Sequence, residues 1–414
     1  QRLGRVLVSQ KALPPDTSTL SVTKESRIPM TDKFMLSPFS EDHELFRQQC
    51  RKFVEKELAP HAAEWEEKKD FPNKVFRRVG EMGYHGILIP EEYGGSGGGY
   101  LMASVWSEEM TRIGSGGVSA GLGMHGLIVL PAIAKFGTEE QKERFLIPGV
   151  QGEKIGALGL TEPVAGTDLA NIRSAARREG DHYILNGSKT FITNGTRADF
   201  VLVLCKTNPG AGYKGFSTLI VEKGMPGFSQ GKPLEKLGWH AGDTAELTFE
   251  NVVVPMVNRL GEEGMGFYNA MANLEWERLM MALGTVYGAQ LAFEKTKSYI
   301  LQREAFGRPI AKFQVNRHKM VDMAVRIEAS RQLNYYALRK LVNGEECARE
   351  VSMAKIFSAE IGEFVATNCL QLHGGYGYMR EYEVERFFRD VRINSIGGGT
   401  SEILKEIVGR IMGL

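Results

Sequence analysis

The sequence predicts a multidomain α+β protein with an N-terminal α-helical domain, a middle β-barrel or sandwich domain and a C-terminal four-helix bundle. The hydrophobic period changes from helical to strand-like near residue 155 and back again near residue 266. A length of 414 residues also exceeds what one simple core accommodates. We therefore expect a leader over residues 1–40, helical domains over 41–154 and 266–414, and a β domain over 155–265.

The leader carries scattered basic residues among Ser, Thr and Pro, which is typical of the end of an organelle-targeting segment. Asp16, Glu25 and Asp32 weaken that interpretation. A leader without any targeting role fits equally well.

The first helical zone is indicated by apolar residues at helical spacing in Glu44–Leu58, Tyr100–Arg112 and Leu127–Phe136. Between them lies the glycine-rich stretch Gly94–Gly99. It lacks the GxGxxG spacing of a dinucleotide-binding loop, so we expect a flexible turn between helices.

The middle zone contains short β-type runs separated by Asn-Gly, Pro-Gly and Gly-Asp turn signals. Four runs are clearest: 182–187, 200–204, 216–221 and 245–249. Several short strands at regular spacing predict a small barrel or sandwich.

The last zone has long amphipathic segments at about 267–302, 315–343 and 346–372, with shorter ones after residues 381 and 401. Leu279, Leu283, Val286 and Phe293 follow one helical stripe. Such helices predict an antiparallel bundle.

Composition restricts the function. The 51 basic and 50 acidic residues give a net charge of +1, which provides no field for nucleic acid. No apolar run approaches the roughly 18 residues of a spanning helix, so we expect no integral membrane segment. The four cysteines should be buried free thiols, and the eight histidines lack metal-site spacing, so we expect no metal.

Three loops indicate the chemistry: Leu160–Asp168, Phe191–Gly195 and Ile396–Glu402. In the first, Pro163 and Gly166 predict a rigid turn that exposes backbone N–H groups to a ligand. The last contains three consecutive glycines, where the backbone itself is accessible.

These loops, together with Arg303–Ile310, Gln314 and Gln371–Gly377, resemble the acyl-CoA dehydrogenase family over residues 40–414. The resemblance implies FAD as cofactor and an acyl-CoA substrate that is oxidised to trans-2-enoyl-CoA in fatty-acid β-oxidation. It also implies a homotetramer, a dimer of dimers, that passes electrons to electron-transfer flavoprotein. The location implied is the mitochondrial matrix, or alternatively the bacterial cytoplasm.

The resemblance also assigns residues to FAD. Thr161 would bind the flavin edge, Phe191 would shield the flavin, and Arg303 would reach the pyrophosphate of a neighbouring subunit's FAD. The complete set is Leu158, Leu160, Thr161, Gly166, Thr167, Phe191, Ile192, Thr193, Arg303, Phe306, Gln314, Gln371, Gly374, Gly375, Thr400 and Glu402.

The catalytic base is the unusual feature. The position that carries the base in most of the family is Gly398, which has no side chain for the task, although its backbone N–H can bind the thioester carbonyl oxygen. A minority, the long-chain and isovaleryl types, place a glutamate before an arginine on the first bundle helix, and Glu277 precedes Arg278 in this way. Glu275 lies roughly 200° around that helix and cannot face the same cleft. We therefore predict Glu277 as the base, and the resemblance assigns substrate contacts to Thr167, Tyr268, Glu275, Arg278 and Gly399.

The sequence indicates the length and branching of the substrate's acyl group less directly than it indicates the reaction. Trp106 and the small residues Ala120, Gly121, Gly123 and Gly126, which would leave room for an extended tail, favour a long chain. An isovaleryl or branched-chain dehydrogenase, an acyl-CoA oxidase and a catalytically silent acyl-CoA-binding protein remain alternatives. The turn at 238–242 departs from the arginine-containing turn of the family, without a consequence that the sequence reveals.

Overall fold

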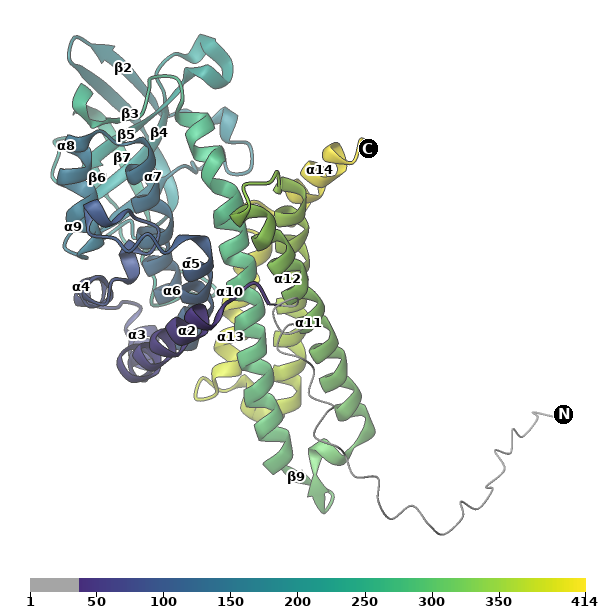
Figure 1. Cartoon of the computed structure of the whole chain (residues 1–414). Coiled ribbons are helices and arrows are strands. Elements are labelled where there is room, and N and C mark those ends of the chain that lie inside the picture. The colour runs from purple at the N-terminus through teal and green to yellow at the C-terminus, as the bar shows by residue number, and fades with distance from the viewer. Residues whose placement is uncertain (1–36) are drawn as a thin grey trace. The chain divides into compact units, whose positions relative to one another are not determined.

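The computed structural model describes residues 37–414, and the leader predicted for residues 1–40 lies almost wholly outside them. The described chain runs from a group of helices through a mixed sheet to a bundle of long helices (Figure 1). The predicted α+β class, with its helical, β and helical parts in that order, is confirmed.

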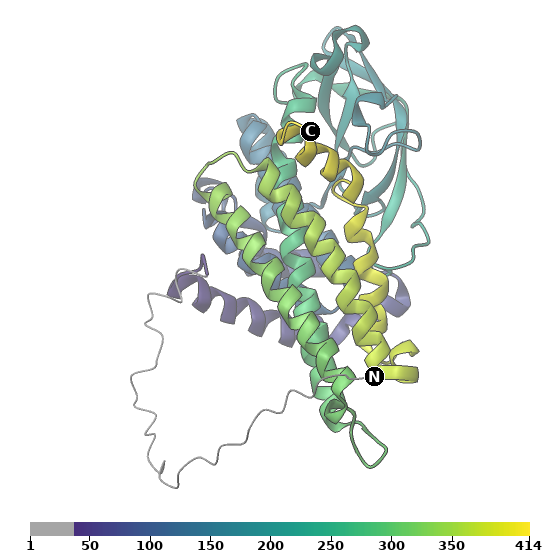
Figure 2. The same ribbon diagram turned by 90° about the vertical axis from the view of Figure 1, so that its right-hand side faces the viewer.

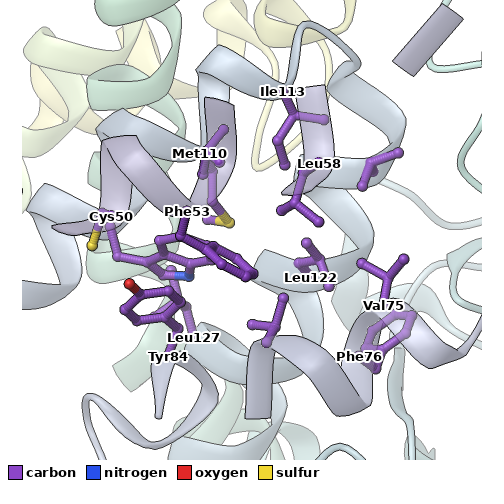
Figure 3. Close-up of a cluster of buried hydrophobic side chains, with 14 of the residues drawn as sticks. Cys50, Phe53, Leu58, Val75, Phe76, Tyr84, Met110, Ile113, Leu122 and Leu127 are labelled. Carbon is purple, nitrogen blue, oxygen red and sulfur yellow. The ribbon is translucent and has the colours of Figure 1, made fainter. Parts of the chain in front are cut away.

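The N-terminal helices pack around an aromatic core. They are α2 (Glu41–Phe53), α3 (Ala62–Lys68), α4 (Lys74–Glu81), α5 (Gly99–Met110), α6 (Gly116–Gly123), α7 (Leu130–Phe136), α8 (Glu139–Gln141) and α9 (Ile147–Val150). Tyr84 stacks on Trp106 with ring centroids 4.4 Å apart, and the Phe53 ring contacts both. Met110 and Leu122 belong to the same buried cluster (Figure 3). Trp106 is therefore a core residue.

The glycine-rich stretch at 94–99 is held firmly, which corrects the expected flexible turn. The N–H groups of Gly95, Ser96, Gly97 and Gly98 donate to carbonyls between residues 86 and 90. A Cβ on Gly95 would lie 2.0 Å from the Ile89 carbonyl oxygen. Glycine is required here for close backbone approach.

The helices α6 and α7 join through the π-helix η6 (Met124–Val129) into one helix over Gly116–Phe136. Within this 21-residue helix an 18-residue window has a mean hydropathy of 1.6, so the expectation that no apolar run approaches spanning length was wrong. Its most apolar window is 72% buried within the protein, which identifies it as a core helix.

Two of the small residues of this helix, Gly121 and Gly126, allow close packing. A Cβ on Gly121 would lie 2.9 Å from Asn194 Oδ1, and one on Gly126 would lie 2.7 Å from the His85 ring. At Gly121 and Gly126 the expected space for an extended acyl tail is therefore absent, whereas a Cβ on Gly123 would make only an ordinary contact of 3.7 Å with Met280.

The strands form one eight-stranded sheet of order β6-β7-β3-β2-β4-β5-β8, with β1 paired to β4. Their bounds are β1 (Gly156–Gly159), β2 (Ala175–Glu179), β3 (His182–Thr193), β4 (Phe200–Lys206), β5 (Phe216–Glu222), β6 (Phe228–Gln230), β7 (Thr244–Pro255) and β8 (Arg259–Leu260). The pair β3 and β7 is twice as long as predicted. On β4, Val201 and Val203 join the core of the β domain, whereas Phe200 and Leu202 pack against the N-terminal helices. Both faces of this strand are buried.

The bundle consists of α10 (Gly266–Gln302), α11 (Gln314–Val342) and α12 (Ala348–His373), with α13 (Glu383–Val391) and α14 (Ser401–Ile411) along the remaining side (Figure 2). The hairpin β9 (Glu304–Ala305) and β10 (Arg308–Pro309) joins α10 to α11. At about 1.5 Å per residue, α10 is about 55 Å long. It contacts α5 and β5 as well as the bundle, so it links all three parts.

The four cysteines, Cys50, Cys205, Cys347 and Cys369, are all buried and unpaired. The prediction of buried free thiols is confirmed.

Candidate active site

A three-glycine loop lies beside α10. Gly397–Gly399 connects the 3₁₀ turn η13 (Arg392–Ser395) to α14. Gly398 and Gly399 have φ angles of 65° and 100°, which favour glycine. Arg278 Nε donates to the Gly398 carbonyl at 3.2 Å, and Lys355 Nζ donates to the Gly399 carbonyl at 2.6 Å. The loop is thus attached to both α10 and α12.

Glu277 lies on the α10 face that is turned toward this loop. One turn later on the same face is Met281, whose Sδ lies 2.7 Å from the place that a Cβ on Gly398 would take. Burial raises the pKa of the Glu277 carboxyl to about 7, and the neighbouring Arg278 cation offsets part of that rise. A carboxylate with a pKa near neutrality is suited to general-base catalysis.

Glu275 points elsewhere. Cys347 Sγ donates to its Oε2 at 3.5 Å, and burial together with the charge of Glu275 raises the pKa of Tyr100. The structure therefore separates the two glutamates, as the helical geometry predicts, and Glu275 as a substrate contact stays a prediction. Tyr268, near the start of α10, is 43% exposed.

A buried ion pair between Lys189 and Glu162 holds the loop Leu160–Asp168, which follows β1. Lys189 of β3 donates to Glu162 Oε1 at 2.9 Å and to the Leu160 carbonyl at 3.0 Å. Burial by itself would raise the pKa of Glu162, but hydrogen bonds from the Arg173 N–H and from Lys189 hold it below its ordinary value. Thr161 Oγ1 donates to the Thr190 carbonyl, so the loop is pinned to β3.

These contacts hold Leu160 and Thr161 in place while Gly166 and Thr167 stay exposed at the surface. Leu158, in contrast, lies in β1 and packs against the N-terminal helices.

Phe191 combines strain with exposure. Its φ of 61° is unusual for a bulky side chain, and 69% of the residue is exposed. Ile192 beside it is buried, and Thr193 is half-buried. The strained backbone at Phe191 directs its ring toward solvent. Such a ring can pack against the face of a flat ligand.

A second group of predicted residues surrounds a cavity of about 530 Å³ at the other end of α10. Arg303, Gln371, Gly374 and Gly375 line it, whereas Phe306 and Gln314 do not. Phe306 is 95% exposed beside the β9–β10 hairpin. Tyr299, Asn316 and Lys319 also line the cavity and were not found from sequence. The i,i+3 spacing of Asn316 and Lys319 near the start of α11 is the signal that would have revealed them.

This cavity fits the diphosphate of FAD. Arg303 and Lys319 provide two cations, and a Cβ on Gly374 or Gly375 would have no neighbouring atom within 4 Å, so their backbone is open to a ligand. Near the glycine loop, Thr400 is the N-cap of α14 and accepts from the Ile403 N–H, while Glu402 is exposed.

Three conserved domain families match the chain. Residues 40–153 match the acyl-CoA dehydrogenase N-terminal domain, 157–252 the middle domain and 264–413 the C-terminal domain.

Related proteins cover nearly the whole chain. The mitochondrial long-chain specific acyl-CoA dehydrogenase of Mus musculus is 41% identical over 92% of this chain and 89% of its own. The short-chain specific acyl-CoA dehydrogenase of Clostridium acetobutylicum is 43% identical, covering 89% of this chain and 97% of its own. The mitochondrial isovaleryl-CoA dehydrogenase of Pongo abelii is 39% identical, covering 99% and 97%.

Solved structures agree. An acyl-CoA dehydrogenase from Geobacillus kaustophilus has a TM-score of 0.88 and 44% identity, covering 91% of this chain and 99% of its own. A chain from a structure of the electron transferring flavoprotein of Acidaminococcus fermentans has a TM-score of 0.87 and 40% identity, covering 90% and 98%.

The succession of a helical domain, a mixed sheet and a helical bundle, together with these matches, places the chain among the flavin-dependent oxidoreductases. With matches to all three of its domains, the chain belongs to the acyl-CoA dehydrogenase family, whose members depend on FAD.

Proposed function

We propose that this enzyme removes the α-proton and the β-hydride of an acyl-CoA thioester to give trans-2-enoyl-CoA, with Glu277 as the catalytic base. The observation that carries the proposal is the Glu277 carboxyl, whose pKa is raised to about 7, on the α10 face beside the Gly397–Gly399 loop. Gly398 has no side chain with which to take a proton, so the task falls to Glu277.

Each group has a defined part in this chemistry. An α-C–H next to a thioester is a weak acid, so it needs a base within reach and a donor to its carbonyl oxygen. Glu277 takes the proton, and the Gly398 N–H stabilises the charge that develops on the oxygen. Bound FAD would supply the acceptor for the hydride that leaves the β-carbon. Arg278 keeps the loop in place through its hydrogen bond to the Gly398 carbonyl.

For the substrate we propose a long-chain acyl-CoA in fatty-acid β-oxidation, with an isovaleryl or other branched-chain acyl-CoA as the second candidate. The long-chain, isovaleryl and short-chain relatives differ little in identity, at 41%, 39% and 43%. The proposal of a long-chain or isovaleryl substrate rests on Glu277. This residue has the position at which the long-chain and isovaleryl members of the family carry their base.

We further propose that FAD is shared between subunits of a homotetramer. Glu277 and Arg303 are 26 residues apart along α10 and the turn that follows it, a separation of about 40 Å. One FAD cannot contact residues at both ends, so the cavity at Arg303 serves the flavin of a neighbouring subunit. The proposed electron acceptor is electron-transfer flavoprotein. The proposed location is the mitochondrial matrix or a bacterial cytoplasm, because the relatives include a mitochondrial protein and a bacterial one.

The test of the base compares Glu277→Gln with Glu275→Gln. Loss of a positioned base should slow flavin reduction by about 10²–10⁴-fold, while Glu275→Gln should leave most of it intact. Anaerobic bleaching of the flavin by saturating acyl-CoA measures this step directly. If Glu275→Gln abolishes bleaching and Glu277→Gln does not, the assignment is reversed.

The pH dependence gives an independent check. The base must be ionised to act, so the rate of flavin reduction should rise with pH through about 7, the pKa of Glu277. In the Glu277→Gln variant the remaining rate should lose this transition. Bleaching of the wild-type flavin would exclude a catalytically silent protein, and steady peroxide formation without a flavoprotein acceptor would favour an oxidase.

A further inference from the structure

The loop that presents the Gly398 N–H has no side chain of its own at three successive positions, Gly397, Gly398 and Gly399. Glycine loses more conformational freedom on folding than any other residue. A three-glycine loop therefore has many conformations of similar energy, and contacts from outside must select one of them.

The first contact lies at the entrance to the loop, where the Gly397 N–H donates to the Ile393 carbonyl at 2.8 Å. Beyond it, the carbonyls of Gly398 and Gly399 accept from Arg278 and Lys355. Because a peptide unit is planar, the fixed carbonyls of Gly398 and Gly399 also orient the N–H groups of Gly399 and Thr400. The peptide unit that carries the Gly398 N–H therefore lies between two fixed units, one held by the Gly397 N–H and the other by Arg278, and Lys355 fixes the unit that follows.

The burial of Lys355 is not explained by its contribution to the stability of the fold. It is 1% exposed, and burial together with the nearby Arg278 cation lowers its pKa to about 8, while the Glu402 carboxylate offsets part of that fall. Within residues 37–414, no carboxylate forms an ion pair with it at 4.0 Å or less; its hydrogen bond goes to the Gly399 carbonyl. Burying a cation without a close ion-pair partner is costly.

We propose that Lys355 is a positioning residue of the active site. Together with Arg278 it holds Gly397–Gly399 in the conformation that presents the Gly398 N–H to the thioester carbonyl oxygen. The proposal rests on the proposed function, because it assumes that this N–H stabilises the transition state. A purely structural lysine that joins α12 to α14 is the alternative.

The test uses Lys355→Met in the FAD-loaded enzyme, because methionine keeps most of the length and loses the donor. The matched control is Lys405→Met, at an exposed lysine of α14 that pairs with Glu360 of α12 at 3.5 Å. The rescue variant is Lys355→Arg, which keeps a cationic donor.

Two readouts are needed. Hydrogen–deuterium exchange of the segment 393–403 should become about tenfold faster in Lys355→Met than in Lys405→Met. The rate of anaerobic flavin reduction at saturating acyl-CoA should fall at least tenfold, approaching the 10²–10³-fold that loss of an oxyanion donor causes. The KM and the melting temperature should change little, and Lys355→Arg should recover much of both losses.

The proposal is overturned if exchange in segment 393–403 is unchanged, or if Lys355→Met lowers the melting temperature strongly or does not fold, because the lysine would then serve the fold. A loss of activity in Lys355→Met with unchanged hydrogen exchange in segment 393–403 would also reject the positioning role of Lys355. Hydrogen exchange does not depend on turnover, so it tests the contact between Lys355 and the loop separately from the proposed function. If no acyl-CoA reduces the flavin of the wild-type protein, the proposed function is rejected. Faster exchange in Lys355→Met would still support the contact in that case.

Discussion

At the scale of single residues, Gly398 and Met281 explain why the proposed base, Glu277, lies on a helix and not in the glycine loop. A side chain at position 398 would need a φ of 65°, and its Cβ would lie 2.7 Å from Met281 Sδ. The first condition costs about 1–2 kcal/mol for a residue other than glycine. The second requires Met281 to move. Glu277 avoids both, because the same face of α10 carries it to the loop.

This geometry predicts the outcome of relocating the base. A Glu277→Gly, Gly398→Glu variant should remain nearly inactive, because Met281 occupies the space of the new side chain. Adding Met281→Ala should restore a measurable part of flavin reduction, at least tenfold above the double variant. The control is Glu277→Gly with Met281→Ala, which has no carboxylate at either position and should stay inactive. Equal activity with and without Met281 would show that this side chain is no obstacle.

At the scale of elements, α10 divides the cofactor residues into two groups. Figure 1 shows the sheet beside one end of α10 and β9 at the other. Leu160, in the loop after β1, shares a buried cluster with Phe267 at the start of α10, whereas Arg303 at the end of α10 lines the cavity with Lys319 and Gly374. The stiffness of the helix fixes this separation. This separation supports the proposal that the active site beside Glu277 and the cavity at Arg303 belong to different flavins.

Removal of a cation from this cavity should weaken FAD retention. Arg303→Ala removes charge-assisted bonds that are worth about 1.5–3 kcal/mol each, so the FAD dissociation constant should rise roughly 10–100-fold. Fluorescence of released FAD during dilution measures it. Arg308→Ala is the matched control: this arginine lies in the same hairpin, packs 4.3 Å over the Phe313 ring and does not line the cavity. Similar retention in the two variants would remove Arg303 from the site.

At the scale of the whole molecule, the turn at 238–242 joins all three parts of the chain. Asp390 of α13 accepts from the N–H groups of Trp239 at 2.6 Å and Gly116 at 3.0 Å. Glu66 of α3 accepts from Ser115 Oγ and from the Ala241 N–H, and its Oε2 is buried without a hydrogen-bond partner. Burial, and then the charge of Glu66, raises the pKa of Asp390 to about 6.

This junction predicts a pH-dependent stability. A carboxyl whose pKa is higher in the folded than in the unfolded state destabilises the fold as pH rises through that interval, here from about 4 to about 6. Glu66→Gln should relieve the repulsion and raise the free energy of unfolding by about 1 kcal/mol at pH 7.5, since one pKa unit is about 1.4 kcal/mol. The gain should shrink at pH 5, where Asp390 is mostly protonated. Thermal unfolding at the two pH values measures it, with the exposed neighbour variant Glu67→Gln as control. A gain that is equal at both pH values would contradict the role of Asp390.

The sequence by itself determined the order of helical, β and helical parts, the positions of the long bundle helices and the buried state of the four cysteines. These properties follow from local periodicity and residue type, which act over a few neighbours. It also identified Glu277 and Arg303 as candidates, because each stands in a short motif, and it predicted from helical geometry that Glu275 and Glu277 diverge.

Only the tertiary structure decided the rest. Four features join segments that are far apart in the chain. They are the contact of Met281 with the position of Gly398, the hydrogen bond of Lys355 to Gly399, the place of Lys319 in the cavity and the junction at Trp239. The tight packing of Gly121 and Gly126 likewise depends on Asn194 and on His85 across a helix boundary. Such contacts leave no periodic signal in the sequence, because the partner of each residue is set by how the helices and the sheet pack together.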